Sequence, residues 1–352
     1  MSCEGARMSY EGDSVCSDAE PKPGSKRHSS SNSSSGSKGG KCESPNSKPS
    51  CSQNGEIPFR DFMSLYIFVK LLGYGAFGTV NLMRDLISGF FYAVKVVKKN
   101  GPHTDDKTRY EIELGMKLDS KNVCKVHRFH EDNEHFYMIM DYLKGMDLCD
   151  FIRKDPKFFM SNPKIFWFVV ESILHGLAYL HSQGIAHMDI KPENIFLLLD
   201  NEGNIIGVKL IDLGLSMVVN NVVNGTKKCF RGTNIYMAPD FFHPFSNIDC
   251  KVDIWSIGIT VFAMIKASLP TEIESRKKDP KRRQNEIYQK IERLRMNESF
   301  NPFGGKTSED PNIAKMESFT RSCLITDPTK RPTAVELLGD IPLTSTISQM
   351  IL

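Results

Sequence analysis

Short runs of apolar residues alternate with glycines and polar residues between residues 66 and 141. The runs are rich in Val, Phe and Tyr, and turn-forming residues separate them, which is typical of strands in an antiparallel sheet. A charged segment at 109–118 interrupts the runs and predicts one helix. We therefore predict strands at residues 66–73, 79–84, 90–98, 124–130 and 135–141.

From residue 144 onward the apolar residues follow a helical period instead. The period is clearest at 163–182, which predicts a long helix. Its periodic apolar residues are Ile165, Phe168, Val169, Ile173, Leu177 and Leu180. We find no internal repeat, so we predict a single α+β architecture with two lobes. A small antiparallel β-sheet lobe with one helix would precede a larger, mainly α-helical lobe.

The first 57 residues differ in composition from the rest of the chain. They contain 16 Ser but only 11 hydrophobic residues, and their seven basic residues balance seven acidic ones. Such a segment buries too little apolar surface to offset the entropy of folding. We therefore predict a disordered Ser-rich tail over 1–57, with a docking segment as the alternative, and a separate C-terminal tail over 341–352.

The chain as a whole has the composition of a globular protein with a hydrophobic core. Hydrophobic residues make up 40%, and 45 basic against 42 acidic residues leave a net charge of +3. A charge this small gives no reason to expect a nucleic acid or a membrane as partner. The nine cysteines include no C-x-x-C pair, and no secretory signal is visible. We expect reduced thiols and an intracellular location, cytoplasmic or nuclear.

A glycine-rich segment lies at the turn between the first two predicted strands. It comprises Leu72, Gly73, Tyr74, Gly75, Ala76, Phe77, Gly78, Thr79 and Val80. Glycines at the tip of a hairpin let backbone N–H groups approach the phosphates of a nucleotide. A structural glycine hairpin or a dinucleotide-binding loop would show similar spacing. The dinucleotide loop requires a helix next, however, and here a strand follows.

Lys95 is a charged residue inside an otherwise apolar predicted strand. It could extend its charge to the surface, or it could bind the phosphates of a nucleotide and pair with a carboxylate of the next helix. Glu111 and Glu113 are the candidates for that carboxylate, and they face different directions because two residues turn about 200° around a helix. We favour Glu111, since Leu114 and Leu118 then fall on the adjoining apolar stripe.

Two segments further along the chain carry the strongest chemical signal. They are His187-Met188-Asp189-Ile190-Lys191-Pro192-Glu193-Asn194 and Asp212-Leu213-Gly214. With the glycine loop and Lys95 in this order, the sequence resembles the eukaryotic-type protein kinases over about residues 59–338. Lys191 and Gly232-Thr233 resemble the serine/threonine branch of that family.

The resemblance implies a bilobal protein-kinase fold over residues 58–340. The N-lobe and hinge would occupy 58–143, and the C-lobe would occupy 144–340. ATP would bind under the glycine loop, next to Lys95 and Glu111. The residues implied to line the adenine pocket are Leu72, Val80, Ala93, Met140, Asp141, Leu143 and Phe196.

The resemblance also implies a reaction, in which the γ-phosphoryl group of Mg-ATP passes to a Ser or Thr hydroxyl of a protein substrate. Asp189 would orient the hydroxyl and accept its proton, and Lys191 would offset charge on the transferred group. Asn194 and Asp212 would supply oxygen ligands for Mg²⁺.

Several residues differ from those usual in the family. Met188 replaces an arginine that gathers a phosphate on the activation loop, so we expect activity to be independent of phosphorylation there, at Ser216 or Thr226. Gly115 replaces a large apolar residue one turn after Glu111. This predicts a gap in the packing, a less stable helix position and room for an activating partner.

Further departures concern the branch and one ion pair. Asp240 stands where the family has Glu, so its predicted pair with Arg331 should be looser. The His-Met-Asp and Asp-Leu-Gly segments, in which Leu213 replaces the common Phe, also resemble Wee-type kinases, which modify tyrosine. A dual-specificity or Wee-like enzyme is therefore one alternative. A catalytically weak or partner-activated scaffold with the kinase fold is another, although Lys95 and Asp189, which a scaffold would lose, are present.

The sequence says little about the substrate. Asp147 and Glu193 match positions that meet upstream arginines in kinases with basic substrates, although both could be cap or surface residues. A basic cluster at 276–283 is either a solvated face or a site for docking or nuclear import. We expect protein substrates with Ser or Thr acceptors and no nucleic acid, because the cluster lacks interleaved aromatic residues.

Overall fold

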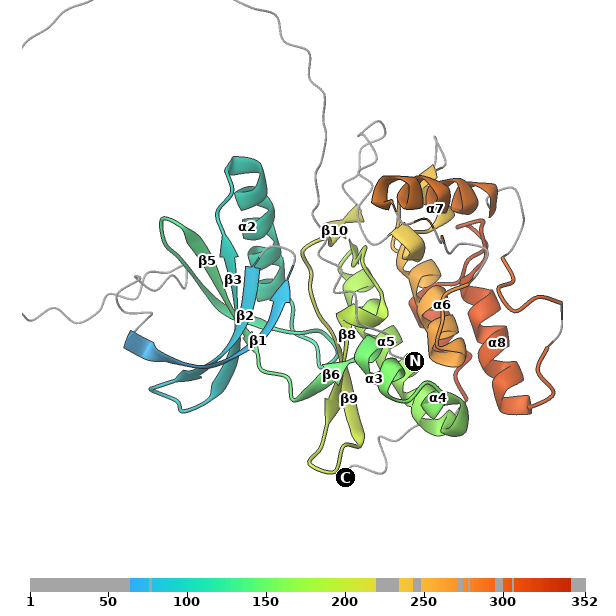
Figure 1. Ribbon diagram of the computed structural model, residues 1–352, viewed down its shortest axis with the longest axis horizontal. Coiled ribbons are helices and arrows are strands. Elements are labelled where there is room, and N and C mark those ends of the chain that lie inside the picture. Colours follow the sequence, from blue (N-terminus) through green and yellow to red (C-terminus); the bar gives the residue numbers. More distant parts are fainter. Residues whose placement is uncertain are drawn as a thin grey trace, which may run out of the picture.

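The computed structural model describes residues 64–75, 78–219, 234–242, 248–270, 275, 277, 279–294, 300–305 and 307–342. Outside these ranges lie the predicted tail at 1–57, most of that at 341–352, and Ala76, Phe77, Thr226, Gly232 and Thr233. The described residues form a sheet lobe with one helix and a larger helical lobe (Figure 1). The predicted α+β fold class with these two lobes is confirmed.

The small lobe is a five-stranded antiparallel sheet with the order β1-β2-β3-β5-β4. Its strands are β1 (Tyr66–Gly75), β2 (Gly78–Asp85), β3 (Phe91–Lys98), β4 (Val126–Glu131) and β5 (His135–Asp141). Val80, Lys95 and Met138 are cross-strand neighbours in the register, so their side chains share one face of the sheet. The central position of β3 therefore holds Lys95 between two paired strands.

Helix α2 (Pro102–Lys117) packs on this face of the sheet. It begins seven residues before the predicted 109–118, because the polar residues 102–108 carry no apolar period that could reveal it. Pro102 suits the first turn of a helix, where its missing N–H needs no partner. Asp105 in the same turn is stabilised by the positive end of the helix dipole.

The larger lobe is built around two long apolar helices, α5 and α6. Its helices are α3 (Leu148–Lys154), α4 (Phe158–Ser161), α5 (Pro163–Ser182), α6 (Lys251–Lys266), α7 (Pro280–Leu294), α8 (Pro311–Cys323) and α9 (Ala334–Gly339). All side chains of α6 from Val252 to Ile265 are buried. Among the described residues, α5 is the one helix long and apolar enough to cross a membrane, and its apolar side chains form part of the core of this lobe.

Two small sheets lie where the lobes meet (Figure 1). One pairs β6 (Gly145–Asp147), β8 (Ile195–Leu199) and β9 (Ile205–Leu210), and the other pairs β7 (Ile185–Ala186) with β10 (Met217–Val218). Main-chain bonds attach the small lobe to β9. Leu210 N donates to Asn122 O at 2.8 Å, and Cys124 N donates to Leu210 O at 2.8 Å. The connection between α2 and β4 is therefore fixed to the larger lobe.

The ion pair of Asp240 and Arg331 is tight and buried, so the prediction of a looser pair is wrong. Nη1 and Nη2 of Arg331 lie 3.2 and 2.8 Å from Oδ1 and Oδ2 of Asp240. The side chains are 0% and 1% exposed. The guanidinium also donates to the carbonyls of Ile325, Lys251 and Thr326. These bonds hold Arg331 close enough for the shorter carboxylate to reach both nitrogens.

We expect Asp240→Asn to lower the free energy of unfolding by about 3–5 kcal/mol, because a buried guanidinium would lose its counter-charge. Asp240→Glu should lower it by about 1–3 kcal/mol, because a methylene is added to a closed site. Urea unfolding measures both. A glutamate variant more stable than the wild type would contradict the tight packing described above.

Candidate active site

Lys95 lies at the centre of an ion cluster between the sheet and α2. Its Nζ lies 2.7 Å from Oε1 of Glu111 and 3.1 Å from Oδ1 of Asp212, and the residue is 8% exposed. Burial favours a lower pKa for Lys95, but the two carboxylates outweigh burial and raise this pKa above its ordinary value. Lys95 is therefore charged at neutral pH and is held between two elements.

The geometry selects Glu111 over Glu113 as the partner of Lys95. Glu111 is buried, whereas Glu113 is exposed on the opposite side of α2. The turn after Asp212 also approaches Glu111 closely. A Cβ at Gly214 would lie 3.1 Å from Oε2 of Glu111, so glycine at this position lets the turn and the helix meet.

Asp212 lies two residues after the end of β9 and has a left-handed backbone with φ of 63°. A non-glycine residue adopts this conformation only when its surroundings fix it. Burial favours a higher pKa for Asp212, but the nearby ammonium of Lys95 outweighs it and holds this pKa below its ordinary value. The side chain is nevertheless half exposed. Asp212 thus presents an ionised carboxylate at the junction of the lobes.

A second polar cluster forms on the loop after β7. Oδ2 of Asp189 accepts hydrogen bonds from Lys191 Nζ at 2.7 Å and from Asn194 Nδ2 at 2.8 Å. Asn194 Nδ2 also lies 2.8 Å from the carbonyl oxygen of Asp189. The bonds fix the direction of the Asp189 carboxylate and bring a cation beside it. The structure therefore groups these three residues, as the spacing in the sequence suggested.

Asp253 on α6 anchors this loop by hydrogen bonds. Its carboxylate accepts hydrogen bonds from the backbone N–H groups of His187 and Met188, at 2.8 and 2.9 Å, and lies 2.9 Å from Nε2 of His181. Met188 has a φ of 70°, a conformation that these bonds help to maintain. We did not select Asp253 as a site residue from the sequence. The signal was available, because it is a carboxylate in a run of otherwise apolar residues from Val252 to Ile254.

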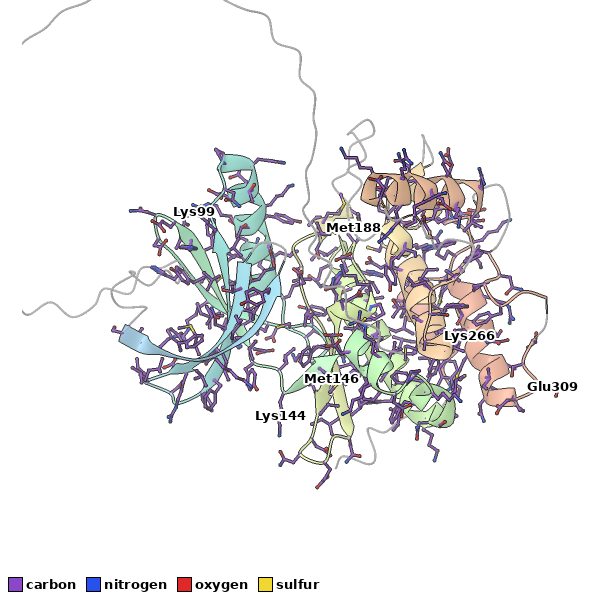
Figure 2. The ribbon with its side chains drawn as sticks, in the orientation of Figure 1. Lys99, Lys144, Met146, Met188, Lys266 and Glu309 are labelled. Carbon is purple, nitrogen blue, oxygen red and sulfur yellow. The ribbon has the colours of Figure 1, made fainter. Side chains whose placement is uncertain are left out.

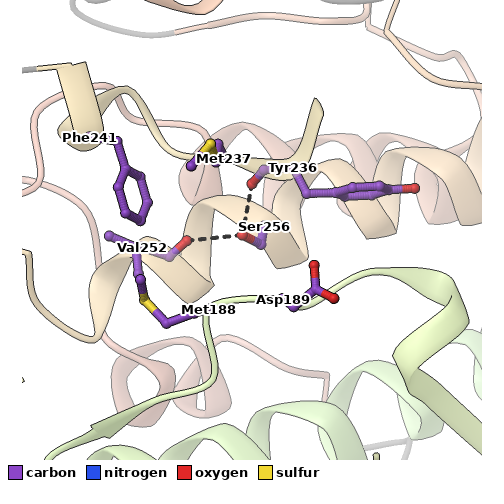
Figure 3. A pocket seen from close by; sticks show the side chains of 7 residues that line it. All are labelled: Met188, Asp189, Tyr236, Met237, Phe241, Val252 and Ser256. Atoms are coloured by element: carbon purple, nitrogen blue, oxygen red, sulfur yellow. Dashed lines mark hydrogen bonds between the residues drawn. The ribbon is translucent and has the colours of Figure 1, made fainter. Parts of the chain in front are cut away.

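Met188 packs into an apolar cluster instead of facing an anion site. It is 7% exposed and lines a cavity of about 10 Å³ with Tyr236, Phe241 and Val252 (Figure 3). A cavity of this size holds at most about one water molecule. Among the described residues, those that line this cavity include no cation that could bind a phosphate.

The proposed phosphate and adenine residues surround Lys95 on the same sheet face. Ala93 and Met140 are cross-strand neighbours and lie two residues from Lys95 and Met138, so they share this face. Val80 pairs with Lys95 itself. The face between the glycine loop and Lys95 is therefore lined by small and apolar side chains, as an adenine ring requires.

The two described outer glycines of the loop have different roles. A Cβ at Gly73 would meet no atom within 4 Å, whereas one at Gly78 would lie 1.8 Å from the carbonyl oxygen of Val96. Gly78 is therefore required by the close pairing of β2 with β3. Gly73 leaves open space for a ligand to approach the backbone.

The remaining predicted residues lie at the junction. Leu143 follows β5, and Phe196 lies in β8. The carboxylate of Asp141 points away from a ligand, because it binds His127 Nε2 at 2.7 Å and Lys209 Nζ at 3.2 Å. Any contact of Asp141 with a nucleotide must therefore use its backbone.

Asn194 and Asp212 offer the oxygen donors that Mg²⁺ prefers. Nδ2 of Asn194 is bonded to Asp189, which leaves its amide oxygen as the metal-binding atom. Among the residues that the structure describes, no group of three His, Cys, Asp or Glu gathers to hold a metal. The donor set therefore fits an ion that takes its other ligands from phosphates and water rather than an all-protein site.

The gap predicted at Gly115 does not exist. A Cβ at Gly115 would lie 2.4 Å from Cγ2 of Val126, and both residues are buried. Helix α2 and strand β4 pack closely, and the side chain of Val126 fills the space next to Gly115. Glycine is therefore needed for this close approach, and the helix position is not weakened by a void.

Comparison with known proteins agrees with this geometry. Residues 66–340 match the family model described as protein kinase domain. The chain is 35% identical over 221 residues to calcium-dependent protein kinase 4 of Plasmodium falciparum, covering 62% of this chain and 40% of that protein. Human ribosomal protein S6 kinase alpha-1 is 37% identical over 221 residues, covering 61% and 28%. Yeast serine/threonine-protein kinase RAD53 is 29% identical over 295 residues, covering 80% and 33%. The matches thus span less than half of each relative.

We expect Gly115→Leu to lower the free energy of unfolding by about 1–3 kcal/mol, because its side chain would collide with Val126. The double variant Gly115→Leu with Val126→Ala should recover part of that loss. Thermal unfolding of the two single variants and the double variant measures this coupling. If Gly115→Leu alone stabilised the protein, a gap would have to exist beside Gly115, and the close packing against Val126 would be contradicted.

Proposed function

The chain belongs to the protein kinase family, and on this premise we propose that it is a serine/threonine protein kinase. It transfers the γ-phosphoryl group of ATP, bound with Mg²⁺, to Ser or Thr hydroxyls of protein substrates. The observation that carries the proposal is Lys95 held between Glu111 and Asp212, because phosphoryl transfer depends on fixing the triphosphate. The similarity to yeast RAD53, a serine/threonine-protein kinase, supports the branch.

The residues of the chain have separate tasks in this reaction. Lys95 binds phosphate oxygens, and Glu111 keeps its ammonium in place. Asp189 orients the acceptor hydroxyl and takes its proton as the oxygen bonds to the γ-phosphorus and the bond between that phosphorus and the bridging oxygen of ADP breaks, a role that contributes about 10²–10⁴-fold in rate. Lys191, with its Nζ 2.7 Å from Asp189, offsets charge on the transferred group. Asn194 and Asp212 would hold Mg²⁺, which would neutralise phosphate charge when bound.

Two alternatives lead to different experiments. A Wee-like or dual-specificity enzyme would modify tyrosine, and the His-Met-Asp segment is the feature that favours it. A scaffold would bind partners without transfer. The intact pair of Lys95 and Glu111 favours an active enzyme over a scaffold.

We propose that activity does not require phosphorylation of the activation segment. Met188 lies in an apolar cluster that cannot bind a phosphate, and Ser216 is 1% exposed with its hydroxyl bonded to the carbonyl of His187. The packing of Val126 against Gly115 also removes the void that had suggested an activating partner. The packing at Gly115 therefore gives no reason to expect that a partner protein activates the enzyme.

The substrate preference and the location are further proposals. Glu193 is the better candidate for contacting a basic residue of the substrate, because the carboxylate of Asp147 already caps α3 by accepting from Asp150 N. The described cysteines are free thiols, with a pKa near 12 for Cys124 and Cys250 owing first to burial. Such thiols suit the reducing interior of a cell, and fractionation of cells would test this.

The transfer reaction can be tested directly with labelled Mg-ATP and a mixture of basic and acidic protein substrates. We expect label on Ser and Thr, and we expect Asp189→Asn to lower kcat by about 10²-fold or more. The affinity for ATP should be retained in this variant, because Asp189 acts on the acceptor. Phosphoamino-acid analysis identifies the acceptor.

The other outcomes separate the alternatives. Label on Tyr would favour the Wee-like enzyme. Absence of transfer with ATP still bound would indicate a missing component, and absence of ATP binding would favour the scaffold. Equal transfer by wild type and Asp189→Asn would contradict the role given to Asp189.

Treatment with a protein phosphatase tests independence from loop phosphorylation. We expect kcat of the dephosphorylated protein to stay within about twofold of that of the untreated protein. The reason is that no described cation near Met188 can bind a phosphate group on the activation loop. Intact mass before and after treatment provides the control. Loss of transfer that returns on rephosphorylation would contradict the proposal.

A further inference from the structure

Three consecutive residues of α2 contact three different parts of the chain. Successive helical residues are separated by 100° around the axis, so Arg109, Tyr110 and Glu111 point in three directions. Glu111 binds Lys95 in β3. The other two side chains bind segments that the proposed reaction does not use directly.

Arg109 points to a charged cluster at the end of the sheet. Its Nη2 and the Nζ of Lys99 both lie 2.5 Å from Oε1 of Glu131. Both cations also lie over the ring of Phe136, at 5.1 and 5.0 Å from its centre. Lys99 is seen on the small lobe in Figure 2. Glu131 therefore connects α2 to the ends of β3, β4 and β5.

The Glu131 carboxylate is shielded from solvent and ionised, so it can keep its contacts with Lys99 and Arg109. It is 17% exposed, and although burial favours a higher pKa, the hydrogen bonds from Lys99 and Arg109 outweigh it and lower the pKa of Glu131 below its ordinary value. The carboxylate is consequently ionised at neutral pH. Hydrogen bonds to a charged group contribute more than neutral ones.

Tyr110 connects the same turn of α2 to the segment after Asp212. Its hydroxyl accepts a hydrogen bond from the backbone N–H of Val218 at 3.2 Å. Val218 lies in β10, which pairs with β7 directly before the loop of Asp189. One turn of α2 thus contacts the sheet, the ammonium of Lys95 and the strand next to the catalytic loop.

We propose that Glu131 and Tyr110 are positioning residues for phosphoryl transfer. Glu131 acts through Arg109, and Tyr110 acts through β10. Together they keep α2 where Glu111 reaches Lys95, without a phosphorylated segment or a partner. The inference rests on the proposed kinase function. In this inference, contacts within the chain itself stabilise the position of α2 in which Glu111 binds Lys95.

The test compares Glu131→Gln and Tyr110→Phe with wild type. Glu113→Gln is the matched control, because it removes a carboxylate from the exposed side of the same helix. We measure kcat, KM for ATP, the thermal unfolding midpoint, and amide hydrogen exchange in α2. We expect Glu131→Gln to lower kcat about tenfold and Tyr110→Phe to lower it severalfold, with faster exchange in α2. Glu113→Gln should change neither kcat nor the hydrogen exchange of α2.

Coupling identifies the route of the effect. If Glu131 acts through Arg109, Glu131→Gln combined with Arg109→Gln should lower kcat no further than the larger single effect. Additive losses would overturn this route. Unchanged kcat and unchanged exchange in both Glu131→Gln and Tyr110→Phe would overturn the whole proposal, as would equal changes in the Glu113→Gln control.

Two features keep the result interpretable. Should Glu131→Gln unfold, Tyr110→Phe decides the question, because it removes one hydroxyl from a side chain that is 40% exposed. Hydrogen exchange does not depend on turnover. If the wild type transfers no phosphate, the proposed function fails, while selective loosening of α2 in the two variants would still support the positioning contacts.

Discussion

The contact of one buried ammonium with two carboxylates is the constraint on which the arrangement of the two lobes depends. Lys95 comes from β3, Glu111 from α2 and Asp212 from the chain after β9. Burial of such charges costs several kcal/mol per ion, and only close pairing offsets that cost. The contact therefore forms only when α2 lies against the sheet and β9 lies beneath both. The main-chain bonds between Leu210 and the α2–β4 connection maintain this relation.

The second half of the site depends on α6. This helix is buried on all sides, so it cannot shift without disturbing a close-packed core. Asp253 on α6 orients the loop that carries Asp189, and Ser256 lies 2.8 Å from the carbonyl oxygen of Tyr236. The phosphate side and the acceptor side of the site thus have separate supports. The contact of Tyr110 with Val218 links the first support to the second through β10 and β7, and Glu131 joins α2 to the ends of the sheet strands.

The departures of this chain from the common kinase pattern are matched by local packing. Val126 occupies the space next to Gly115, and Met188 packs against apolar side chains. Asp240 reaches Arg331 with both oxygens despite its shorter side chain. At Gly115 and Asp240 the contacting residue comes from another element, so the substitution alone gave a misleading expectation of a void or a loose pair.

The sequence by itself determined the α+β class, the order of the five strands and the helix of the small lobe, and the residue types of the site, because periodicity and motif spacing depend on neighbours along the chain. It did not reveal the short strands β6 to β10 in the segment where a helical period was expected. It did not reveal the first turns of α2, whose polar residues carry no period. The structure confirmed the expectation that Glu111 rather than Glu113 meets Lys95. Only the tertiary structure decided that Val126 closes the space at Gly115 and that Asp253 holds the catalytic loop. These outcomes depend on distances between residues up to 72 positions apart, as for His181 and Asp253, and such distances are set by the packing of whole elements.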